Sequence, residues 1–342
     1  MTDTNPIGLT GIEWVEFGSP EPEALHQLFT QFGFSLLSLH RDKDVAYYNQ
    51  NDINFLLNRH PFSFAHDFYK SHGPSICSMG WRVKNANKAF KMAIQRGAKA
   101  AVKTDYDRPA IYGIGNSLIY FIETSDNLYQ DLGFEGLENP RKVKSKGFTY
   151  IDHLTNNVEE GTMAKWTKFY KEVFGFTEVR YFDIKGAKTG LTSFALRSPD
   201  GSFCIPINEA TDKKSQINEY LEEYKGAGIQ HLAFCTEDIV SSVASLQSNT
   251  KIETLDIDDE YYAEVFDRVP NVTEDQEKLK ELQILVDGDE KGYLLQIFTK
   301  NVVGPIFIEI IQRKNHQSFG EGNFGALFRS IERDQEKRGY LK

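Results

Sequence analysis

The chain has 342 residues, of which 40% are hydrophobic and 26% charged, and it contains 25 Phe and 16 Tyr with a formal net charge of −10. This length supports two domains, or one large one. The net negative charge argues against nucleic acid and anionic membranes as partners. No apolar run approaches the roughly 18 residues that a membrane helix needs. The three cysteines lack CxxC spacing and the first eight residues lack the basic and apolar regions of a signal peptide, so we expect a reduced, cytoplasmic protein.

The first half of the sequence alternates predicted strands with predicted helices. Residues 11–17 predict a strand, and residues 21–32 predict a helix that Gly33 ends. Further strands are predicted at residues 35–39, 45–49, 53–58, 75–83, near 100 and at 118–123, with a second helix at 85–96. The Gly, Pro and charged residues between 127 and 147 predict an irregular linker. The linker would separate an N-terminal domain (1–126) from a C-terminal domain (148–342).

The second half repeats this order of elements. Residues 12–14 (Ile-Glu-Trp) are echoed by residues 151–153 (Ile-Asp-His), and the Phe-Gly-Phe tripeptide at 32–34 is echoed at 174–176. Strands at 190–197, 203–208, 230–235, 294–299 and 306–312 and a helix at 239–246 complete the pattern. Each half therefore consists of two βαβββ units, which indicates an internal duplication. We expect an α+β fold with two domains, each of paired βαβββ modules forming an open barrel-like sheet.

A buried carboxylate in the second half needs a chemical explanation. Glu309 lies in the strongly apolar strand 306–313, where an ionised side chain is costly unless it is paired or binds a metal. His153 and His231 lie on two earlier apolar strands at equal intervals, since 231 − 153 = 78 and 309 − 231 = 78. Two His and one carboxylate on separate strands match the facial triad of non-haem Fe(II) oxygenases, although the ligands alone also allow Zn, Mn or Ni.

Each of these residues also has a simpler interpretation. Glu309 by itself would pair with an Arg or Lys of a neighbouring strand, and a single His on an apolar strand face is more often a satisfied core residue than a ligand. Three such residues on matched strands of one half favour the metal site. In the first half Trp14 stands where His153 stands, and Glu123 echoes Glu309 without a histidine partner.

The C-terminal segment predicts an amphipathic helix. Phe324, Leu327, Phe328 and Ile331 recur at helical spacing from about residue 323, and Gly339 ends the helix. Two glycines just before the helix give it a bendable approach. Periodicity alone allows either a terminal helix packed on the sheet or a lid over the site.

Four segments of the second half carry a resemblance to a known family. They are residues 226–233 (GAGIQHLA), 294–300 (LLQIFTK), 306–313 (IFIEIIQR) and 319–332 (FGEGNFGALFRSIE). These motifs resemble the 4-hydroxyphenylpyruvate dioxygenase family, and the paired modules resemble the vicinal-oxygen-chelate superfamily to which that family belongs. The resemblance covers essentially the whole second half, whereas the first half matches mainly in architecture.

The resemblance implies a set of site residues. The Fe(II) ligands would be His153, His231 and Glu309. The substrate-binding residues would be Ser193, Asn208, Gln216, Gln296, Phe298, Phe319, Asn323 and Phe324. The sequence departs from the family in having Ala210 where many members have Pro, and short connections make the placement of Gln216 less secure than that of Asn208. Gln230 would face away from His231 in an unbroken strand, so we leave it out of the pocket.

The resemblance also implies a reaction. The substrate would be a 2-oxo acid, 4-hydroxyphenylpyruvate, which with O2 would give homogentisate and CO2 in tyrosine catabolism, with Fe(II) as the cofactor. Phe319 and Phe324 would enclose the aromatic ring, and Ser193, Asn208 and Gln216 would face the phenol oxygen. We also expect a homo-oligomer, either a dimer or a tetramer.

Two other functions stay open. Hydroxymandelate synthase uses the same substrate, metal and ligands but hydroxylates the benzylic carbon. Phe298 shares a strand face with Gln296, and the hydroxymandelate-forming relatives have a smaller aliphatic residue there, so a bulky Phe298 favours attack on the ring. A non-catalytic module that keeps the metal for structure or ligand binding is the alternative from a different class.

Overall fold

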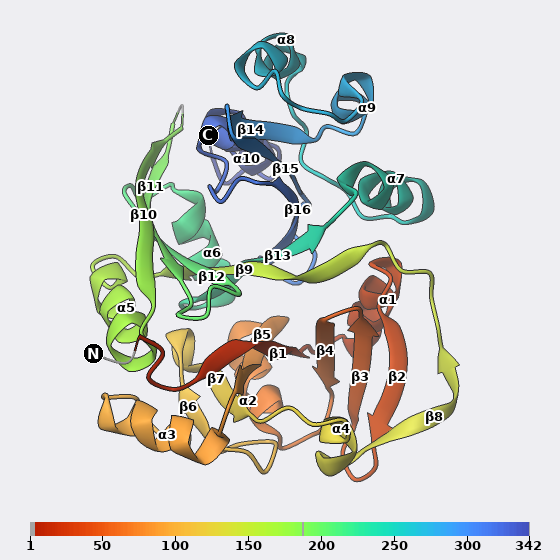
Figure 1. Cartoon of the computed structure of the whole chain (residues 1–342), viewed down its shortest axis with the longest axis vertical. Helices are drawn as coiled ribbons and strands as arrows, with labels where there is room; N and C mark the ends of the chain where they lie inside the picture. The colour runs from red at the N-terminus through yellow and green to blue at the C-terminus, as the bar shows by residue number, and fades with distance from the viewer. Residues whose placement is uncertain (1–3, 187, 342) are drawn as a thin grey trace.

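The structure, a computed structural model, describes residues 4–186 and 188–341 and contains two eight-stranded mixed sheets, one in each half of the chain (Figure 1). The first half contains β1 (Leu9–Gly18), α1 (Pro22–Gln31), β2 (Ser35–His40), β3 (Val45–Gln50), β4 (Ile53–Asn58), α2 (Phe64–His72), β5 (Ser75–Val83), α3 (Ala86–Gln95), β6 (Ala110–Tyr112), η1 (Ile114–Asn116), β7 (Leu118–Ile122), α4 (Leu128–Asp131) and β8 (Phe134–Arg141). The second half contains β9 (Phe148–Val158), α5 (Met163–Phe169), η2 (Tyr170–Phe174), β10 (Thr177–Lys185), β11 (Gly190–Arg197), β12 (Cys204–Ala210), α6 (Gln216–Tyr224), β13 (Gly228–Thr236), α7 (Ile239–Asn249), α8 (Asp259–Arg268), α9 (Gln276–Glu281), β14 (Leu285–Asp289), β15 (Gly292–Phe298), β16 (Phe307–Lys314), η3 (Glu321–Asn323) and α10 (Phe324–Lys337).

The strand order confirms the duplicated βαβββ architecture. In the second sheet the order is β10-β11-β12-β9-β13-β16-β15-β14, so two four-strand modules meet at the antiparallel pair β9–β13. The first sheet has the corresponding centre, with β1 antiparallel to β5, and the order β6-β7-β5-β1-β4-β3-β2-β8. The strand predicted near residue 100 is reduced to a single bridge between Ala100 and Ile111.

The segment 127–147, for which the sequence predicts an irregular linker, contains a short helix and a strand. The helix is α4, and the strand β8 pairs with β2 at the edge of the first sheet. Most side chains of β8 are exposed. An exposed edge strand tolerates the Pro, Gly and charged residues that a central strand rejects, which is why its sequence resembles a linker.

Several helices and three strands carry too weak a pattern to be predicted from the sequence. These elements are α2, α6, α8, α9, β6, β10 and β14. Strand β10 is a solvent-facing edge strand with little hydrophobic alternation. The helices are short, and each buries only one to three side chains. Tertiary packing therefore stabilises them more than their own periodicity.

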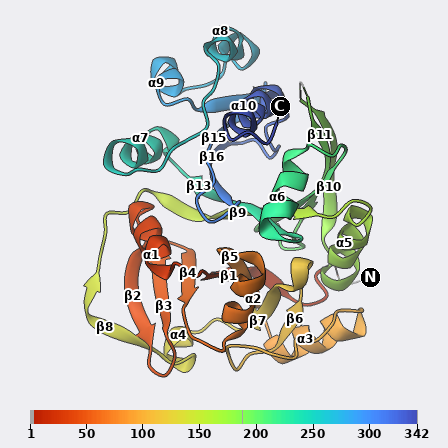
Figure 2. The ribbon, with the colours of Figure 1, turned by 180° about the vertical axis from the view of Figure 1, so that it is seen from behind.

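A continuous apolar core joins the two halves. Phe34 stacks on Phe55 with ring centroids 4.3 Å apart, and both rings contact Phe234 of the second half, at 5.8 and 6.0 Å. Trp81 packs against Phe174 at 4.8 Å. On the other side of the second sheet, α10 lies within the curve of the strands (Figure 1), close to α6 and β10 when the molecule is viewed from behind (Figure 2). The second sheet therefore has its apolar core on one face and a helix over the other.

Candidate metal centre

The three central strands of the second sheet bring the predicted ligands together. Ala233 of β13 pairs with His153 of β9 on one side and with Glu309 of β16 on the other. His231 lies two residues before Ala233, and residues two apart on a strand share a face. The register thus directs both imidazoles and the carboxylate to one point above the small Ala233 side chain, and all three ligands are buried.

The three ligand atoms form a compact triangle. His153 Nε2 lies 3.0 Å from Glu309 Oε2 and 3.3 Å from His231 Nε2, and His231 Nε2 lies 3.4 Å from the same carboxylate oxygen. Adjacent ligands about 2.1 Å from an octahedral metal ion are roughly 3.0 Å apart. Among the described residues, these three side chains form a group that could hold a metal cation.

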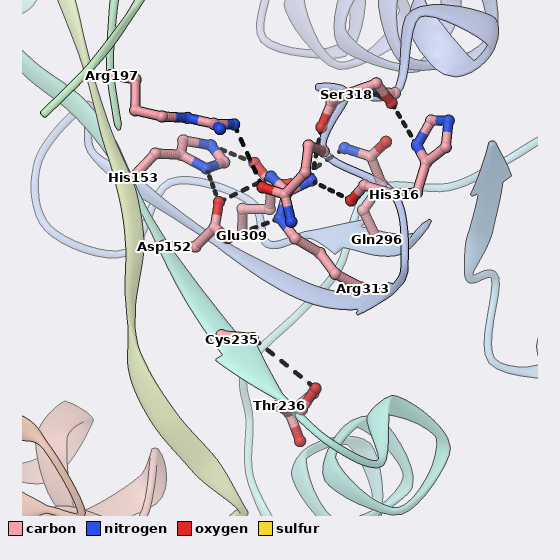
Figure 3. A network of polar contacts seen from close by, with 12 residues as sticks. Asp152, His153, Arg197, Cys235, Thr236, Gln296, Glu309, Arg313, His316 and Ser318 are labelled. Carbon is pink, nitrogen blue, oxygen red and sulfur yellow. Dashed lines mark hydrogen bonds and ion pairs between the residues drawn. The ribbon is translucent and has the colours of Figure 1, made fainter. Parts of the chain in front are cut away.

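The outer nitrogen of each imidazole meets a side-chain oxygen. His153 Nδ1 is 2.7 Å from Asp152 Oδ2, and His231 Nδ1 is 3.0 Å from Gln230 Oε1 (Figure 3 shows the first pair). Each Nδ1–H donates to its oxygen, which fixes the tautomer and leaves the Nε2 lone pair free for a metal. The residues present therefore fit a divalent cation bound by two neutral imidazoles and one carboxylate.

Charges in the centre are strongly coupled. Burial opposes ionisation of Glu309, but the charge and hydrogen bond of His153 outweigh it and lower the pKa of Glu309 to about 2. Burial likewise opposes protonation of His153, but Glu309 and Asp152 outweigh it and raise its pKa to about 9. Burial lowers the pKa of His231. One proton on His153 thus balances the carboxylate charge, and a bound cation would replace that proton.

Gln230 corrects the sequence-based interpretation, which had this side chain facing away from His231. The pairing between β13 and β9 shifts register between Ile229 and His231, so Gln230 is the extra residue of a β-bulge. The bulge turns Gln230 into the cavity, where its side chain contacts His231. Regular alternation fails at a bulge, and the sequence gives no local signal for this one.

The second oxygen of Glu309 is held by an amide chain. Gln296 Nε2 donates to Glu309 Oε1 at 3.1 Å, and Asn323 Nδ2 donates to Gln296 Oε1 at 2.9 Å. Gly320 lies beside this chain with φ 80°, and a Cβ atom at that position would overlap Gln296 Oε1. Glycine is therefore required at 320 both for the backbone conformation and for the space that Gln296 occupies.

One cavity collects every predicted site residue. All three ligands and all eight predicted substrate-binding residues line it, including Gln216 at the start of α6. The lining residues that the sequence analysis did not assign are Thr155, Phe182, Ile184, Leu191, Pro206, Gln230, Phe307, Gly320, Leu327, Phe328 and Ile331. Four of these could have been found from the predicted strands and the helix periodicity, since Thr155, Leu327, Phe328 and Ile331 share faces with assigned residues.

The cavity has a polar group away from the ligands. Ser193 and Asn208 pair directly across β11 and β12. Asn208 Nδ2 lies 3.2 Å from Asn157 Oδ1 and 3.5 Å from Gln230 Oε1. With Gln216, these side chains offer donors and acceptors on the β11–β12 side of the ligand triad.

Aromatic rings surround the ligands. Phe307 stacks on His231 with centroids 4.7 Å apart, and Phe319 meets the edge of His153 at 5.6 Å. Phe182 contacts both Phe319 and Phe324, at 6.1 and 5.3 Å. The cavity therefore combines a polar triad with apolar walls, an environment that suits a flat aromatic ligand.

Glu123 of the first half is not the counterpart of Glu309. It lies just past β7, where it accepts a hydrogen bond at 2.6 Å from the backbone N–H of Ala86 at the start of α3. The residue in the position of Glu309 is Tyr120, because Tyr120 pairs with Gly80 as Glu309 pairs with Ala233. The sequence echo is offset by three residues from the structural one.

Comparison with known proteins places the chain in a family. Residues 3–135 match the N-terminal domain of hydroxyphenylpyruvate dioxygenase, and residues 150–295 match the glyoxalase/bleomycin resistance protein/dioxygenase superfamily. The chain is 47% identical to 4-hydroxyphenylpyruvate dioxygenase from Pseudomonas aeruginosa, with 98% of this chain and 97% of that protein covered. This chain belongs to the 4-hydroxyphenylpyruvate dioxygenase family. The predicted resemblance is thereby confirmed.

Other relatives agree with this family. A 4-hydroxyphenylpyruvate dioxygenase from Legionella pneumophila is 45% identical over 100% of this chain and 99% of its own length, and protein MelA from Shewanella colwelliana is 59% identical over 99% of both chains. A solved fusion protein with a 4-hydroxyphenylpyruvate dioxygenase part matches with a TM-score of 0.84 and 29% identity, over 96% of this chain and 54% of that one. A triple mutant of 4-hydroxymandelate synthase from Streptomyces coelicolor, 24% identical over 96% of this chain and 99% of its own, shares the fold with a TM-score of 0.82. No helix of the described residues is long and apolar enough to cross a membrane.

Proposed function

We propose that this protein is an Fe(II)-dependent dioxygenase that converts 4-hydroxyphenylpyruvate and O2 to homogentisate and CO2 in tyrosine catabolism. Full-length identity of 45–47% to 4-hydroxyphenylpyruvate dioxygenases supports this enzyme. The observation that carries the proposal is the buried His-His-Glu triad in a cavity with aromatic walls. A cation held by these three side chains would keep positions open for a chelating 2-oxo acid and for O2.

Each proposed ligand has a protein partner that would orient it. His153, His231 and Glu309 would hold the iron, while Asp152, Gln230 and Gln296 hold their outer atoms. Bound Fe(II) would supply the redox chemistry, namely activation of O2 for oxidative decarboxylation of the 2-oxo acid and hydroxylation of the ring. The protein's task is to fix the ligand directions before the substrate arrives.

The cavity walls would position the substrate. Phe298 pairs with Glu309 across β15 and β16, so its ring borders the metal position. We assign Phe319 and Phe324 to contact with the substrate ring, and Ser193 and Asn208 with Gln216 to the phenol oxygen. These polar side chains lie on the β11–β12 side of the triad. A ligand that contacts both the metal and these side chains would therefore lie across the strands.

Helix α10 would exclude water from the reaction. Its apolar residues Leu327, Phe328 and Ile331 line the cavity, and its outer face forms ion pairs with the rest of the chain, including Arg333 with Asp258 at 2.6 Å. A wall made by one helix can be opened by moving that helix alone, and closure protects reactive species from water. This supports the lid function over simple terminal packing.

The domain division and the assembly are parts of the same proposal. We assign metal-dependent catalysis to residues 148–342 and a supporting function to residues 1–126, because every triad and cavity residue belongs to the second half. We also propose a cytoplasmic homo-oligomer. Free, buried thiols at all three cysteines are compatible with a reducing compartment.

Product analysis tests the proposed function. Purified protein would be loaded with Fe(II) under anaerobic conditions, its metal content measured, and oxygen uptake followed with 4-hydroxyphenylpyruvate. We expect uptake that depends on both iron and substrate, with homogentisate as the main product on chromatography. Mainly 4-hydroxymandelate would assign the synthase activity instead. Iron binding without oxygen uptake would indicate a non-catalytic module.

A further inference from the structure

An ion pair lies behind one of the proposed metal ligands. Arg313 reaches Asp152 with two parallel hydrogen bonds, Nε to Oδ1 at 2.7 Å and a terminal nitrogen to Oδ2 at 2.8 Å (Figure 3). The same Oδ2 accepts from His153 Nδ1. Burial alone would raise the pKa of Asp152, but Arg313 and His153 hold it well below its usual range. Asp152 is therefore a buried anion shared between an arginine and the imidazole.

The same arginine also holds a loop of the cavity wall. The remaining terminal nitrogen of Arg313 donates to the carbonyl oxygens of Ser318 at 2.6 Å and His316 at 3.2 Å (Figure 3). Phe319 follows directly, with its ring 6.0 Å from the guanidinium carbon and 5.6 Å from the His153 ring. One guanidinium thus connects the partner of a metal ligand with the loop that carries a cavity ring.

The geometry of arginine makes this connection specific. A guanidinium is planar and presents five donors, so one edge can bind a carboxylate while another binds two carbonyls. The side chain of Arg313 is only 11% exposed and that of Asp152 only 9% exposed, so water replaces neither set of bonds easily. Asp152 and the backbone of the 316–319 loop are therefore held by the same buried guanidinium.

We propose that Arg313 is a positioning residue that couples the metal site to the 316–319 loop. Through Asp152 it orients His153 for metal binding, and through the carbonyls of His316 and Ser318 it seats Phe319 against the cavity. Metal binding and loop order therefore favour one another, as thermodynamic linkage requires. This inference rests on the metal centre proposed above and goes beyond it by adding a substrate-side consequence of metal binding.

Metal titration with amide hydrogen exchange tests the coupling. Metal-free protein would be titrated with Co2+, followed by its visible absorption, and exchange of peptides covering residues 315–322 would be measured with and without the metal. In the wild type we expect Co2+ binding to slow exchange in this loop. In Arg313→Met we expect a 10- to 100-fold weaker Co2+ affinity, the range typical of lost outer partners of a ligand, and a loop that exchanges quickly whether or not metal is bound.

Two further variants separate the functions of Arg313. Arg313→Lys keeps a charge near Asp152 but cannot form the fork, so we expect it to recover metal affinity more than loop protection. Arg197 is a matched control, because it also contacts the loop, through Gln317 at 3.2 Å, without bonding to Asp152. Arg197→Met should leave Co2+ affinity at the wild-type value.

The outcomes distinguish this inference from the metal centre itself. A wild-type protein that binds no Co2+ at the triad would overturn the proposed centre and the coupling with it. A folded Arg313→Met protein with wild-type affinity and wild-type loop protection would overturn the coupling alone. Weaker metal binding with a loop that metal still protects would also contradict it, since Arg313 would then act on the metal only. If Arg313→Met does not fold, the comparison of Arg313→Lys with Arg197→Met decides the question.

Discussion

The ligand positions of the second half are occupied in the first half by Trp14, Ser78 and Tyr120. The register establishes the match, because Trp14 and Tyr120 flank Gly80 across the three central strands, as the first and third ligands flank Ala233. The two halves therefore have the same backbone framework but differ in what occupies the equivalent space. One framework is filled by its own side chains, and the other encloses a cavity.

Aromatic packing fills the site of the first half. Trp14 is fully buried, with Tyr106 and Tyr120 at centroid distances of 5.5 and 5.8 Å. The Trp14 ring lies directly over Gly80, where an added Cβ would be 2.6 Å from it. Ala110 takes the place of Phe298, since it pairs with Tyr120 as Phe298 pairs with Glu309. Large and small residues have thus exchanged places between the two sites.

The covering segments differ in the same way. In the first half, Leu128, Leu132 and Phe134 of the α4–β8 region pack directly on the Trp14 cluster. In the second half, α10 covers the site but leaves a cavity beneath it. The comparison teaches that the paired module supplies a framework, while side-chain volume and the cover decide whether it becomes core or binding site.

The largest expected effect follows from removing a ligand. Glu309→Ala and His231→Ala should each lose most of the iron and at least about 10³-fold in turnover, because each removes one of three protein ligands from a buried site. Iron content and oxygen uptake would be measured on the same samples. The first-half control is Glu123→Ala, which removes the contact with the backbone of Ala86 and should keep the iron unchanged. Full activity with normal iron in either ligand variant would exclude the triad.

Removing the cover should affect activity more than metal binding. A variant lacking residues 325–342 should fold and bind iron, because the ligands lie on strands, but we expect on the order of 100-fold lower turnover from an open, hydrated cavity. Circular dichroism, iron content and oxygen uptake would be compared. Normal turnover would reject the lid, and failure to fold would show that α10 belongs to the core.

Emptying the filled site should cost stability without affecting the metal. Trp14→Ala should lower the free energy of unfolding by about 3–5 kcal/mol, as expected for loss of a large buried aromatic side chain. Urea unfolding would measure the loss, and iron content per folded protein should stay constant. A specific loss of iron in this variant would mean that the first half supports the metal site directly.

Changing one residue of the cavity wall should alter the product of the reaction while leaving iron binding and oxygen consumption in place. Phe298→Ile should keep the iron and consume oxygen but divert part of the product to 4-hydroxymandelate, because a smaller side chain gives the substrate ring more freedom. Methylene-scale changes in pockets are worth about 1–3 kcal/mol, so we expect a mixture. Chromatography of the products measures the ratio. Homogentisate alone would remove Phe298 from the determinants of specificity.

A buried acid gives the first half its own dependence on pH. Glu16, the counterpart of Thr155, is fully buried, and burial with the nearby Asp105 raises its pKa from 4.5 to about 7. The folded state holds this proton more tightly than the unfolded state, so stability is full below pH 4.5 and declines as pH rises through 7. Glu16→Gln should remove about 1–3 kcal/mol of the difference in unfolding free energy between pH 5 and pH 8. The control Glu123→Gln should not, and an unchanged slope in Glu16→Gln would contradict the assignment.

Much of this fold and site could be predicted from the sequence because the signals are strong where strands are buried. The strand predicted at residues 75–83 has the same bounds as β5 in the structure. The interval from His153 to His231 reflects the repeat, because β9 and β13 each begin a module; the equal interval to Glu309 does not, because β16 is the last strand of the second module. Polar side chains inside predicted buried strands are uncommon, so His153, His231 and Glu309 stand out, as do Asp152 and Gln230 next to the two histidines. The location of the pocket residues came from the family resemblance rather than from periodicity.

The remaining features depend on contacts that a sequence pattern does not contain. Gln230 enters the cavity through a bulge, and β8 pairs at a sheet edge despite the composition of a linker. The residue that corresponds to Glu309 is Tyr120 and not Glu123. Strand register decides this correspondence, and register cannot be read from the similarity of the two sequence motifs. Asp152 and Arg313 have 160 residues between them in the sequence. They come into contact because β9 and β16, which carry them, lie on either side of β13.

The bulge in β13 has an exact structural parallel that bears on how such sites evolve. In the first sheet the register shifts between Ser78 and Ile76, so Cys77 is bulged just as Gln230 is. In a regular strand only every second side chain points to a given face. At the bulge two adjacent residues, Gln230 and His231, point to the same side, so Gln230 can bind the imidazole of its neighbour. Because the irregularity belongs to the backbone of both halves, mutation at the bulged position can tune the ligand's partner while leaving the ligand and the sheet in place.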